Sequence, residues 1–353
     1  MLAETVDAVI GIDTHRDTHE VEIADTGGQP ITVLRISNDS AGFTRLLATI
    51  AAVVPGPRVA VCIEGSRSYG IGLARVLAAA GLLVIECEQP SRKQRRGKGK
   101  SDPIDAHLAV LAALRLDAGQ LPVPRADGDR EALRILLVAR QEISEARTAQ
   151  IGRLRALLLA GDDTDRQAAR KALTQTALAA LAGRELPAGA CREQAVRHAE
   201  IRRLALALSQ ARQQLRDNRA QLLAIVDDIA PGLTSRFGVG PVSAAQAIVS
   251  FSHPGRCRSE GAFAALSGTS PLPASSGRTV RHRLNRGGDR ALNRAIHAIA
   301  VTRMRSCPRT RAYVARRTAE GKTTREIRRC LKRYIARELY RQLTRSMNPP
   351  ANP

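Results

Sequence analysis

The sequence predicts a mixed α/β domain at the N-terminus, a long helical middle region and a basic, mainly α-helical C-terminal domain. Residues 6–86 alternate short β-branched apolar segments with segments of helical spacing. Residues 129–229 are rich in Ala, Leu, Arg, Gln and Glu, which favour long helices. Positive charge is concentrated after residue 230. These observations place the domain boundaries at residues 1–125, 126–229 and 230–348.

The charge distribution indicates a partner with a phosphate backbone. The net charge of the 353 residues is +22. Residues 231–353 contain 24 Lys and Arg against 5 Asp and Glu, whereas residues 1–230 contain 31 against 28. A solubilising surface would spread its charge more evenly, so this asymmetry favours nucleic-acid binding. Aromatic residues make up only 2% of the chain, so we expect arginine, and not stacking on aromatic rings, to carry most of the binding.

Cysteine spacing and hydropathy indicate a cytoplasmic protein. The six cysteines are far apart and form no C-x-x-C pair, which argues against a zinc site or a disulfide framework. Residues 1–7 lack the basic segment of a signal peptide. No uncharged run is long enough to span a bilayer, so we expect no membrane partner.

The elements expected in the N-terminal domain follow the order β-β-β-α-β-α-β-α. Two of the buried strands end on an acid, at Asp13 and at Glu64. The expected strands are 6–13, 18–24, 31–36, 58–63 and 82–86, and the first helices are 39–53 and 68–80. The first three strands form an antiparallel meander, and the whole order predicts a mixed sheet with flanking helices.

A second pair of acids opens the next helix. The basic run 92–100 is followed by Ser101-Asp102-Pro103-Ile104-Asp105 and an apolar helix over 107–116. Ser101 or Asp102 can cap this helix, and Pro103 suits its first turn. Asp102 and Asp105 are three residues apart and therefore lie on one face. A D-x-x-D pair is weak by itself, because acids are common in first turns.

Asp13, Glu64, Asp102 and Asp105 together predict a site for divalent metal. Four convergent carboxylates repel one another, so they are tolerable together only with cations between them. All-oxygen ligation points to Mg²⁺ or Mn²⁺. Two such ions, about 3.5–4 Å apart, would clamp a phosphodiester. Nearby His15, His19 and His107 lack a paired metal-ligand spacing, and we interpret them as structural or solvated.

The middle region predicts long antiparallel helices. Helices are expected over 129–159, 162–181 and 191–229, and two of them carry apolar stripes. The stripes are Leu133, Leu136, Leu137, Ile143, Ile151, Leu154 and Leu158, and Ile201, Leu204, Leu208, Leu215, Leu222 and Ile225. Such seams are typical of a dimerising coiled coil, although an ordinary bundle without a partner has the same pattern.

The basic C-terminal region begins with a glycine-rich turn. Gly238-Val239-Gly240-Pro241 precedes an alanine-rich helix within 233–248. The arrangement resembles a helix-hairpin-helix element, in which glycine N–H groups and a helix N-terminus meet a phosphate, but a tight interhelical turn explains it equally well. Further helices are expected over 289–305 and 309–345.

A small-residue loop over 266–277 contains the second catalytic candidate, Ser276. The arginines that follow could hold a phosphate and stabilise a charged transition state; they are Arg278, Arg281, Arg283 and Arg286. Spacing reveals no His or Lys base to activate Ser276. A serine before a glycine is usually only a turn residue, so the residues alone leave this role open.

Six motifs, in order, resemble those of one family. In the N-terminal domain they are V-I-G-I-D-T-H at 9–15, C-I-E-G at 62–65 and K-S-D-P-I-D-A at 100–106. In the C-terminal domain they are G-V-G-P at 238–241, S-S-G at 275–277 and R-G-G at 286–288. Together they resemble the bridge-RNA-guided insertion-sequence recombinases, whose N-terminal domain is RuvC-like and carries a DEDD motif. The resemblance covers nearly the whole chain.

The resemblance implies an RNase H-like (RuvC-like) fold in which Asp13, Glu64, Asp102 and Asp105 bind divalent metal. It implies that Ser276 is the nucleophile and forms a phosphoserine link to DNA, releasing a 3′-hydroxyl. Ser275 is the adjacent alternative. The implied partners are the DNA of the element ends and target, a structured guide RNA, and further copies of the chain in a homodimer or homotetramer.

The resulting hypothesis is a transposase that excises and inserts its own mobile element. The alternative is a metal-dependent junction-resolving endonuclease that uses water as nucleophile and needs only the four acids. A third interpretation is a non-catalytic nucleic-acid-binding protein whose acids are ordinary caps and strand ends. A covalent protein–DNA species would distinguish the first from the second, and cleavage of any kind would exclude the third.

Overall fold

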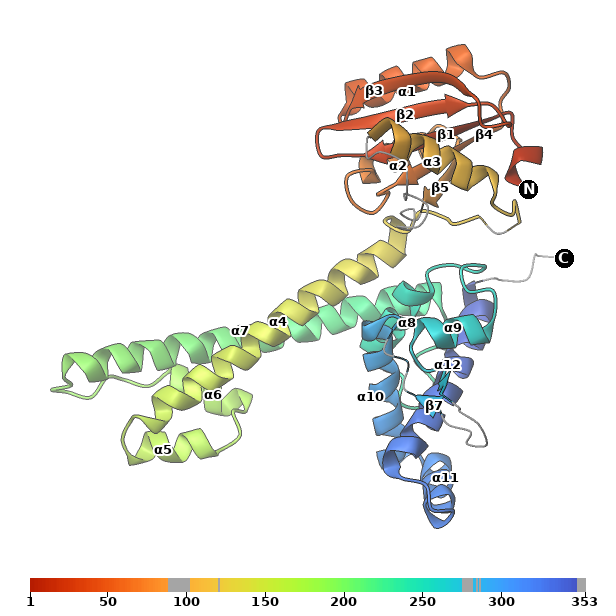
Figure 1. Ribbon diagram of the computed structural model, residues 1–353. Coiled ribbons are helices and arrows are strands. Elements are labelled where there is room, and N and C mark those ends of the chain that lie inside the picture. Colours follow the sequence, from red (N-terminus) through yellow and green to blue (C-terminus); the bar gives the residue numbers. More distant parts are fainter. Residues whose placement is uncertain (88–101, 120, 275–281, 284, 286, 348–353) are drawn as a thin grey trace. The chain divides into compact units, whose positions relative to one another are not determined.

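The computed structural model describes residues 1–87, 102–119, 121–274, 282–283, 285 and 287–347 (Figure 1). The chain forms two compact units. The N-terminal unit contains Met1–Glu131 together with Phe251–Ala262, and the helical unit contains Ala132–Ser250 together with Phe263–Pro353. The predicted division into residues 1–125, 126–229 and 230–348 remains a prediction.

The N-terminal unit is built on a five-stranded mixed sheet of order β3-β2-β1-β4-β5. β1 pairs antiparallel with β2, β2 pairs antiparallel with β3, and β4 is parallel to both β1 and β5. The strands are β1 (Ala8–Thr14), β2 (Thr18–Ala24), β3 (Pro30–Ser37), β4 (Val59–Glu64) and β5 (Leu83–Cys87). The predicted mixed sheet and its order of elements are therefore confirmed.

Helices cover both faces of this sheet (Figure 1). α1 (Ser40–Val53) and α2 (Ile71–Ala79) share a hydrophobic cluster with Ile10 and Ile12 of β1. α3 (Asp102–Leu114) shares a second cluster with Val9. Successive strand residues point to opposite faces, so this alternation divides each strand between the two clusters. A short 3₁₀ helix, Leu2–Glu4, precedes the sheet.

The start of α2 differs from the sequence prediction, and the start of α3 agrees with it. α2 begins at Ile71 and not at 68, because Gly65, with φ +76°, starts a turn in which Ser68 N donates to the Gly65 carbonyl. α3 begins at Asp102, as expected from a cap at Ser101 or Asp102 with Pro103 in the first turn, so Asp102 and Asp105 belong to that turn.

In the helical unit, two long helices lie side by side (Figure 1). The helices of this arm are α4 (Gly128–Leu159), α5 (Asp163–Arg170), α6 (Gln175–Ala182) and α7 (Arg192–Ile229). The prediction of one helix over 162–181 is wrong. Lys171 adopts an extended conformation, and the Thr174 side chain accepts a hydrogen bond from Ala177 N and starts a new helix.

A fixed polar contact joins the two long helices. Asn218 of α7 is buried, and its Nδ2 donates to the Leu136 carbonyl of α4 at 2.9 Å. Arg140 Nη1 donates to the Leu215 carbonyl at 3.0 Å. Buried polar contacts of this kind select one register of two packed helices.

The remainder of the helical unit is mostly helical. Its elements are α8 (Pro241–Phe251), α9 (Glu260–Leu266), β6 (Leu272–Pro273), β7 (His282–Arg283), α10 (Arg290–Ser306), α11 (Pro308–Ala319) and α12 (Thr324–Met347). The predicted helix over 309–345 is divided, because Gly321, with φ +79°, separates α11 from α12. In the part of the chain that the structure describes, none of the helices combines the length and apolar character needed to cross a membrane.

Candidate active site

Two buried acids end neighbouring parallel strands of the N-terminal unit. Asp13 is the last residue but one of β1, Glu64 is the last residue of β4, and the two residues are 8% and 6% exposed. Ile12 and Ile63 are register partners, so Asp13 and Glu64 occupy the next position on each strand. Thr14 Oγ1 donates a 2.7 Å hydrogen bond to the Glu64 carbonyl and joins the two strand ends. The prediction that these acids end adjacent parallel strands is confirmed.

Both acids are on the face of the sheet that α3 covers. Val9 of β1 and Cys62 of β4 belong to the cluster shared with α3. Because side chains alternate along a strand, Asp13 and Glu64 are on that same face. Glu64 is thus separated from the apolar cluster of α1 and α2 by the sheet itself.

A glycine lets α3 approach β1 closely. A Cβ on Gly11 would lie 2.1 Å from the Ala106 carbonyl oxygen and 2.8 Å from Val110 Cγ2, so only glycine fits at this crossing. Leu2 N donates to the Leu116 carbonyl, so α3 begins near the Asp13 end of β1. Asp105 directly precedes Ala106 and is half-buried. The backbone therefore brings the start of α3 to the strand ends that carry Asp13 and Glu64.

Two further acids, missed by the sequence interpretation, lie on this face of β2. Glu20 and Glu22 are register partners of Asp13 and Gly11, and both are buried. Arg35 Nε donates to Glu20 Oε1. His107 Nδ1 of α3 lies 2.7 Å from Glu22 Oε1. The strict alternation of T-H-E-V-E-I-A over 18–24 is the signal that could have placed both glutamates beside Asp13.

The three histidines differ in their surroundings. His15 Nε2 lies 3.3 Å from Asp13 Oδ2, and His107 contacts Glu22, so both touch the acids of this face. His19 is fully buried on the opposite face, where its ring stacks on Phe43 with centroids 6.2 Å apart. Burial lowers the pKa of His19. His19 is therefore a neutral core residue, whereas His15 and His107 hold acids in place.

The donor set fits a hard divalent cation. Asp13, Glu64 and Asp105 supply only carboxylate oxygens, the ligands that Mg²⁺ and Mn²⁺ prefer. Two buried carboxylates side by side are costly unless positive charge compensates them. The side chain of Asp102 lies outside the described residues, and within the described part no group of three or more His, Cys, Asp or Glu is close enough to hold a metal.

The predicted serine nucleophile lies outside the described residues. So do Ser275, Arg278, Arg281 and Arg286. On either side of this segment, β6 and β7 form an antiparallel ladder in which Pro273 pairs with His282. Arg283 of β7 is exposed. The ladder therefore places Pro273 and His282 opposite each other.

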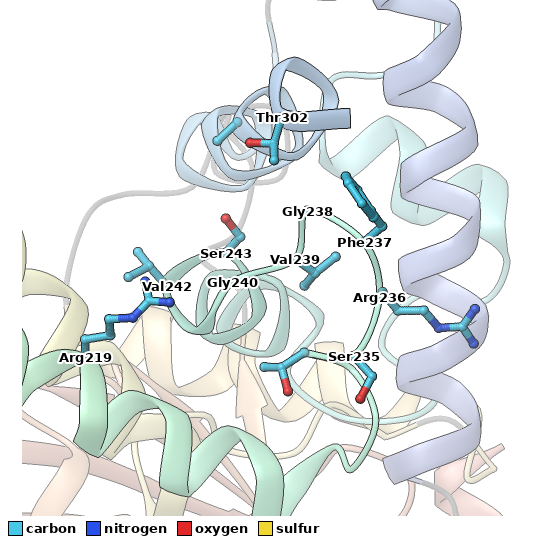
Figure 2. A pocket seen from close by; sticks show the side chains of 12 residues that line it. Arg219, Ser235, Arg236, Phe237, Gly238, Val239, Gly240, Val242, Ser243 and Thr302 are labelled. Atoms are coloured by element: carbon cyan, nitrogen blue, oxygen red, sulfur yellow. The ribbon is translucent and has the colours of Figure 1, made fainter. Parts of the chain in front are cut away.

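A second predicted contact site, Gly238 and Gly240, lies before α8. Gly238 has φ +77° and packs against α10, where Arg303 Nε donates to the Phe237 carbonyl at 2.7 Å. The turn borders a pocket of about 560 Å³. Figure 2 shows Arg219 of α7 and Ser243 of α8 on its walls beside Gly240. Backbone N–H groups at the start of α8 and the Arg219 guanidinium suit an anion.

Comparisons with known proteins give one consistent result. A transposase model, the DEDD transposase domain of IS110 elements, matches residues 10–160. A second model, the transposase IS116/IS110/IS902 family, matches residues 230–315. The first match includes all four predicted acids, and the second includes Ser276.

Two relatives are similar to the chain over different lengths. The insertion element IS110 uncharacterized 43.6 kDa protein of Streptomyces coelicolor is 33% identical over 123 residues, which are 34% of this chain and 30% of the relative. The insertion element IS900 uncharacterized 42 kDa protein of Mycobacterium paratuberculosis is 26% identical over 359 residues, 88% of this chain and 89% of the relative.

Proposed function

The chain belongs to the IS116/IS110/IS902 family of insertion-sequence transposases, and from this premise we propose that it cuts and rejoins DNA through metal-binding acids and a serine nucleophile. The single observation that carries the proposal is the pairing of Asp13 with Glu64. Both acids are buried on one face at neighbouring strand ends, where α3 begins. The strand order β3-β2-β1-β4-β5 supports an RNase H-like, RuvC-like fold for this unit.

Asp13, Glu64, Asp102 and Asp105 would hold Mg²⁺ or Mn²⁺. When bound, such ions stabilise charge on the attacking and leaving oxygens of a phosphodiester. The protein's part would be to orient the ligands: the close approach of Ala106 to Gly11 would hold Asp105 near β1, and the contact of His107 with Glu22 ties the first turns of α3 to β2.

Ser276 would form the covalent bond to DNA. Its hydroxyl gives up its proton to solvent, its Oγ bonds to the phosphorus, the P–O3′ bond breaks, and the departing O3′ takes up a proton from solvent to leave a 3′-hydroxyl. Rejoining reverses these changes with a new 3′-hydroxyl. Arg278, Arg281, Arg283 and Arg286 would stabilise the charge that develops on the phosphate. Ser275 is the adjacent alternative nucleophile.

The remaining proposals concern partners. The basic helical unit would bind element-end and target DNA and a structured guide RNA, with Gly238, Gly240 and Arg219 around one phosphate. The arm of α4 and α7 leaves Ile135, Val138 and Leu206 exposed, which favours a homodimer or homotetramer assembled through it. We place this activity in the cytoplasm, at the nucleoid.

The test is a cleavage reaction with Mg²⁺, element-end DNA and co-purified RNA, resolved on a denaturing protein gel. We expect a DNA-linked protein band that disappears in Ser276→Ala and persists in Ser40→Ala, an exposed serine of α1 outside the S-S-G motif. Loss of the band in Ser275→Ala instead would move the nucleophile by one residue. Cleavage without any linked protein would favour the second candidate, a junction-resolving nuclease that uses water and depends only on the acids.

A further inference from the structure

A basic cleft of about 800 Å³ lies in the helical unit, between α12 and the segment that precedes β6. Of the sixteen described residues that line it, seven are Arg or Lys and one, Glu326, is acidic. Glu326 accepts hydrogen bonds from the backbone N and the hydroxyl of Thr323, so its charge is used to cap α12. The cleft therefore presents a strongly positive surface to a ligand.

The cleft also contains an exposed aromatic ring. Tyr334 of α12 lines it and is 54% exposed, in a chain that has only four tyrosines. Tyr313 of α11 supports this ring from the side: the two centroids are 6.1 Å apart and the planes are nearly perpendicular, at 89°. The Arg316 guanidinium carbon lies 5.5 Å from the Tyr313 centroid. Tyr334 is thus held by a neighbouring ring while more than half of it remains open to a ligand.

Lys332 of the cleft is tied through Asn293 of α10 to the loop that follows α9. Its Nζ donates to Asn293 Oδ1 at 2.6 Å, and Asn293 Nδ2 donates to the Ser267 carbonyl at 2.6 Å. Arg283 of β7 lines the same cleft as Tyr334. A ligand in the cleft would therefore lie beside Pro271, which precedes β6, and Arg283 of β7.

We propose that this cleft binds an unpaired nucleotide of a nucleic acid, with its base stacked on Tyr334 and its phosphates on the surrounding arginines, Arg329, Arg333 and Arg337. A row of cations suits a phosphate backbone, and an open aromatic ring suits any base, because every base has a π-face. A duplex keeps its bases stacked on one another and cannot offer one to Tyr334. The ligand is therefore single-stranded at this point.

This inference rests on the proposed function, because it assigns the cleft to the nucleic acid that the transposase handles. The proposed nucleotide site also goes beyond the proposed function, because α12, which carries Tyr334, begins at Thr324, after the family match that ends at residue 315. One stacking position on Tyr334 is compatible with the expectation that arginine carries most of the binding. The low aromatic content holds for the chain, but two of the four tyrosines gather at this one place.

The test measures binding of fluorescein-labelled single strands to the full-length protein by fluorescence anisotropy, without metal. The probes are DNA and RNA of one sequence, the same DNA backbone with abasic positions, and a duplex. The variants are Tyr334→Leu, which removes the aromatic ring, and Tyr334→Phe, which keeps it. Tyr69→Leu is the matched control, because Tyr69 is 52% exposed in the N-terminal unit. Strand binding without metal does not require the reaction proposed for Ser276. The anisotropy measurement therefore tests the cleft even if that reaction does not occur.

We expect Tyr334→Leu to weaken single-strand binding by about tenfold. Tyr334→Phe and Tyr69→Leu should bind as the wild-type protein does, and the wild-type protein should bind the abasic strand more weakly. A loss confined to RNA or to DNA supports the proposal and identifies the source of the nucleotide. Unchanged binding of Tyr334→Leu to both strands would overturn it, and so would an equal loss with the duplex.

Discussion

Gly11 of β1 and Ala106 of α3 are in direct contact. A Cβ at position 11 would lie 2.1 Å from the Ala106 carbonyl oxygen, closer than any real side-chain contact. This crossing lies two residues before Asp13 and one residue after Asp105 along their elements. The close packing of α3 on β1 therefore brings the first turn of the helix near the end of the strand that carries Asp13.

Gly11→Ala should separate α3 from β1 and reduce DNA cleavage strongly. The added methyl group must displace helix backbone, which costs about 1–3 kcal/mol in a packed core. The free energy of unfolding should fall by this amount, as measured by urea denaturation. Gly72→Ala in α2 is the control: its Cβ would lie 3.5 Å from Phe43, an ordinary contact, and alanine favours the helix. Equal stability of the two variants would contradict the importance of this crossing.

Much of the N-terminal unit could be predicted from the sequence, because its strands and helices follow from local residue patterns. β-branched apolar segments and helical spacing gave the order of the eight elements, and the strand ends gave Asp13 and Glu64. The burial of Glu20 and Glu22 was not predicted, because a glutamate in a strand is usually expected to face solvent. Only the position of α3 over β2 shows that they are buried.

Glu86 provides a pH-dependent contribution to stability. Glu86 is 4% exposed, and burial alone would raise its pKa. Its side-chain hydrogen bonds and ion pair with Arg125, together with the charge of Arg67, outweigh burial and hold the pKa below its ordinary value of 4.5. A lowered pKa in the folded state stabilises the fold above the ordinary value, and this stability is lost as the pH falls through the folded pKa.

Glu86→Gln should therefore destabilise the protein by about 3–5 kcal/mol near neutral pH, because it leaves Arg125 buried without its carboxylate. The deficit should shrink as the pH falls from 4.5 through the lower pKa of folded Glu86, because the wild-type carboxylate then becomes protonated. Urea denaturation across this pH range measures the difference. Glu200→Gln removes an exposed ion pair with Arg203 and should leave unfolding unchanged. A deficit that is constant with pH would show that the carboxylate charge has no part.

Asn218 should fix the packing of α4 against α7. Asn218→Ala removes the hydrogen bond to the Leu136 carbonyl and the 3.3 Å contact with Arg140 Nη1. The expected cost is about 1–3 kcal/mol, read from urea denaturation by circular dichroism. Gln221→Ala, an exposed change on the same helix, is the matched control. If both variants unfold alike, the buried amide does not stabilise the arm.

The helical unit was predicted less completely, again for identifiable reasons. Composition indicated long helices, but the breaks at Lys171 and Gly321 depend on single backbone conformations within otherwise helical sequence. Tyr313 and Tyr334 are 21 residues apart on different helices, so no local pattern reveals their contact. Tertiary packing brings Tyr313 and Tyr334 together, whereas the positions of Asp13 and Glu64 follow from where their strands end.

The most direct test of the account compares cleavage of element-end DNA by the wild-type protein and by Asp13→Asn, with Mg²⁺ and co-purified RNA. Asp17→Asn is the control, because Asp17 is an exposed acid paired with Arg16 in the turn after β1. We predict that Asp13→Asn loses cleavage to background while it folds and binds DNA normally, and that Asp17→Asn cleaves at the wild-type rate. Cleavage by Asp13→Asn at the wild-type rate would contradict the assignment of the acids as the catalytic centre.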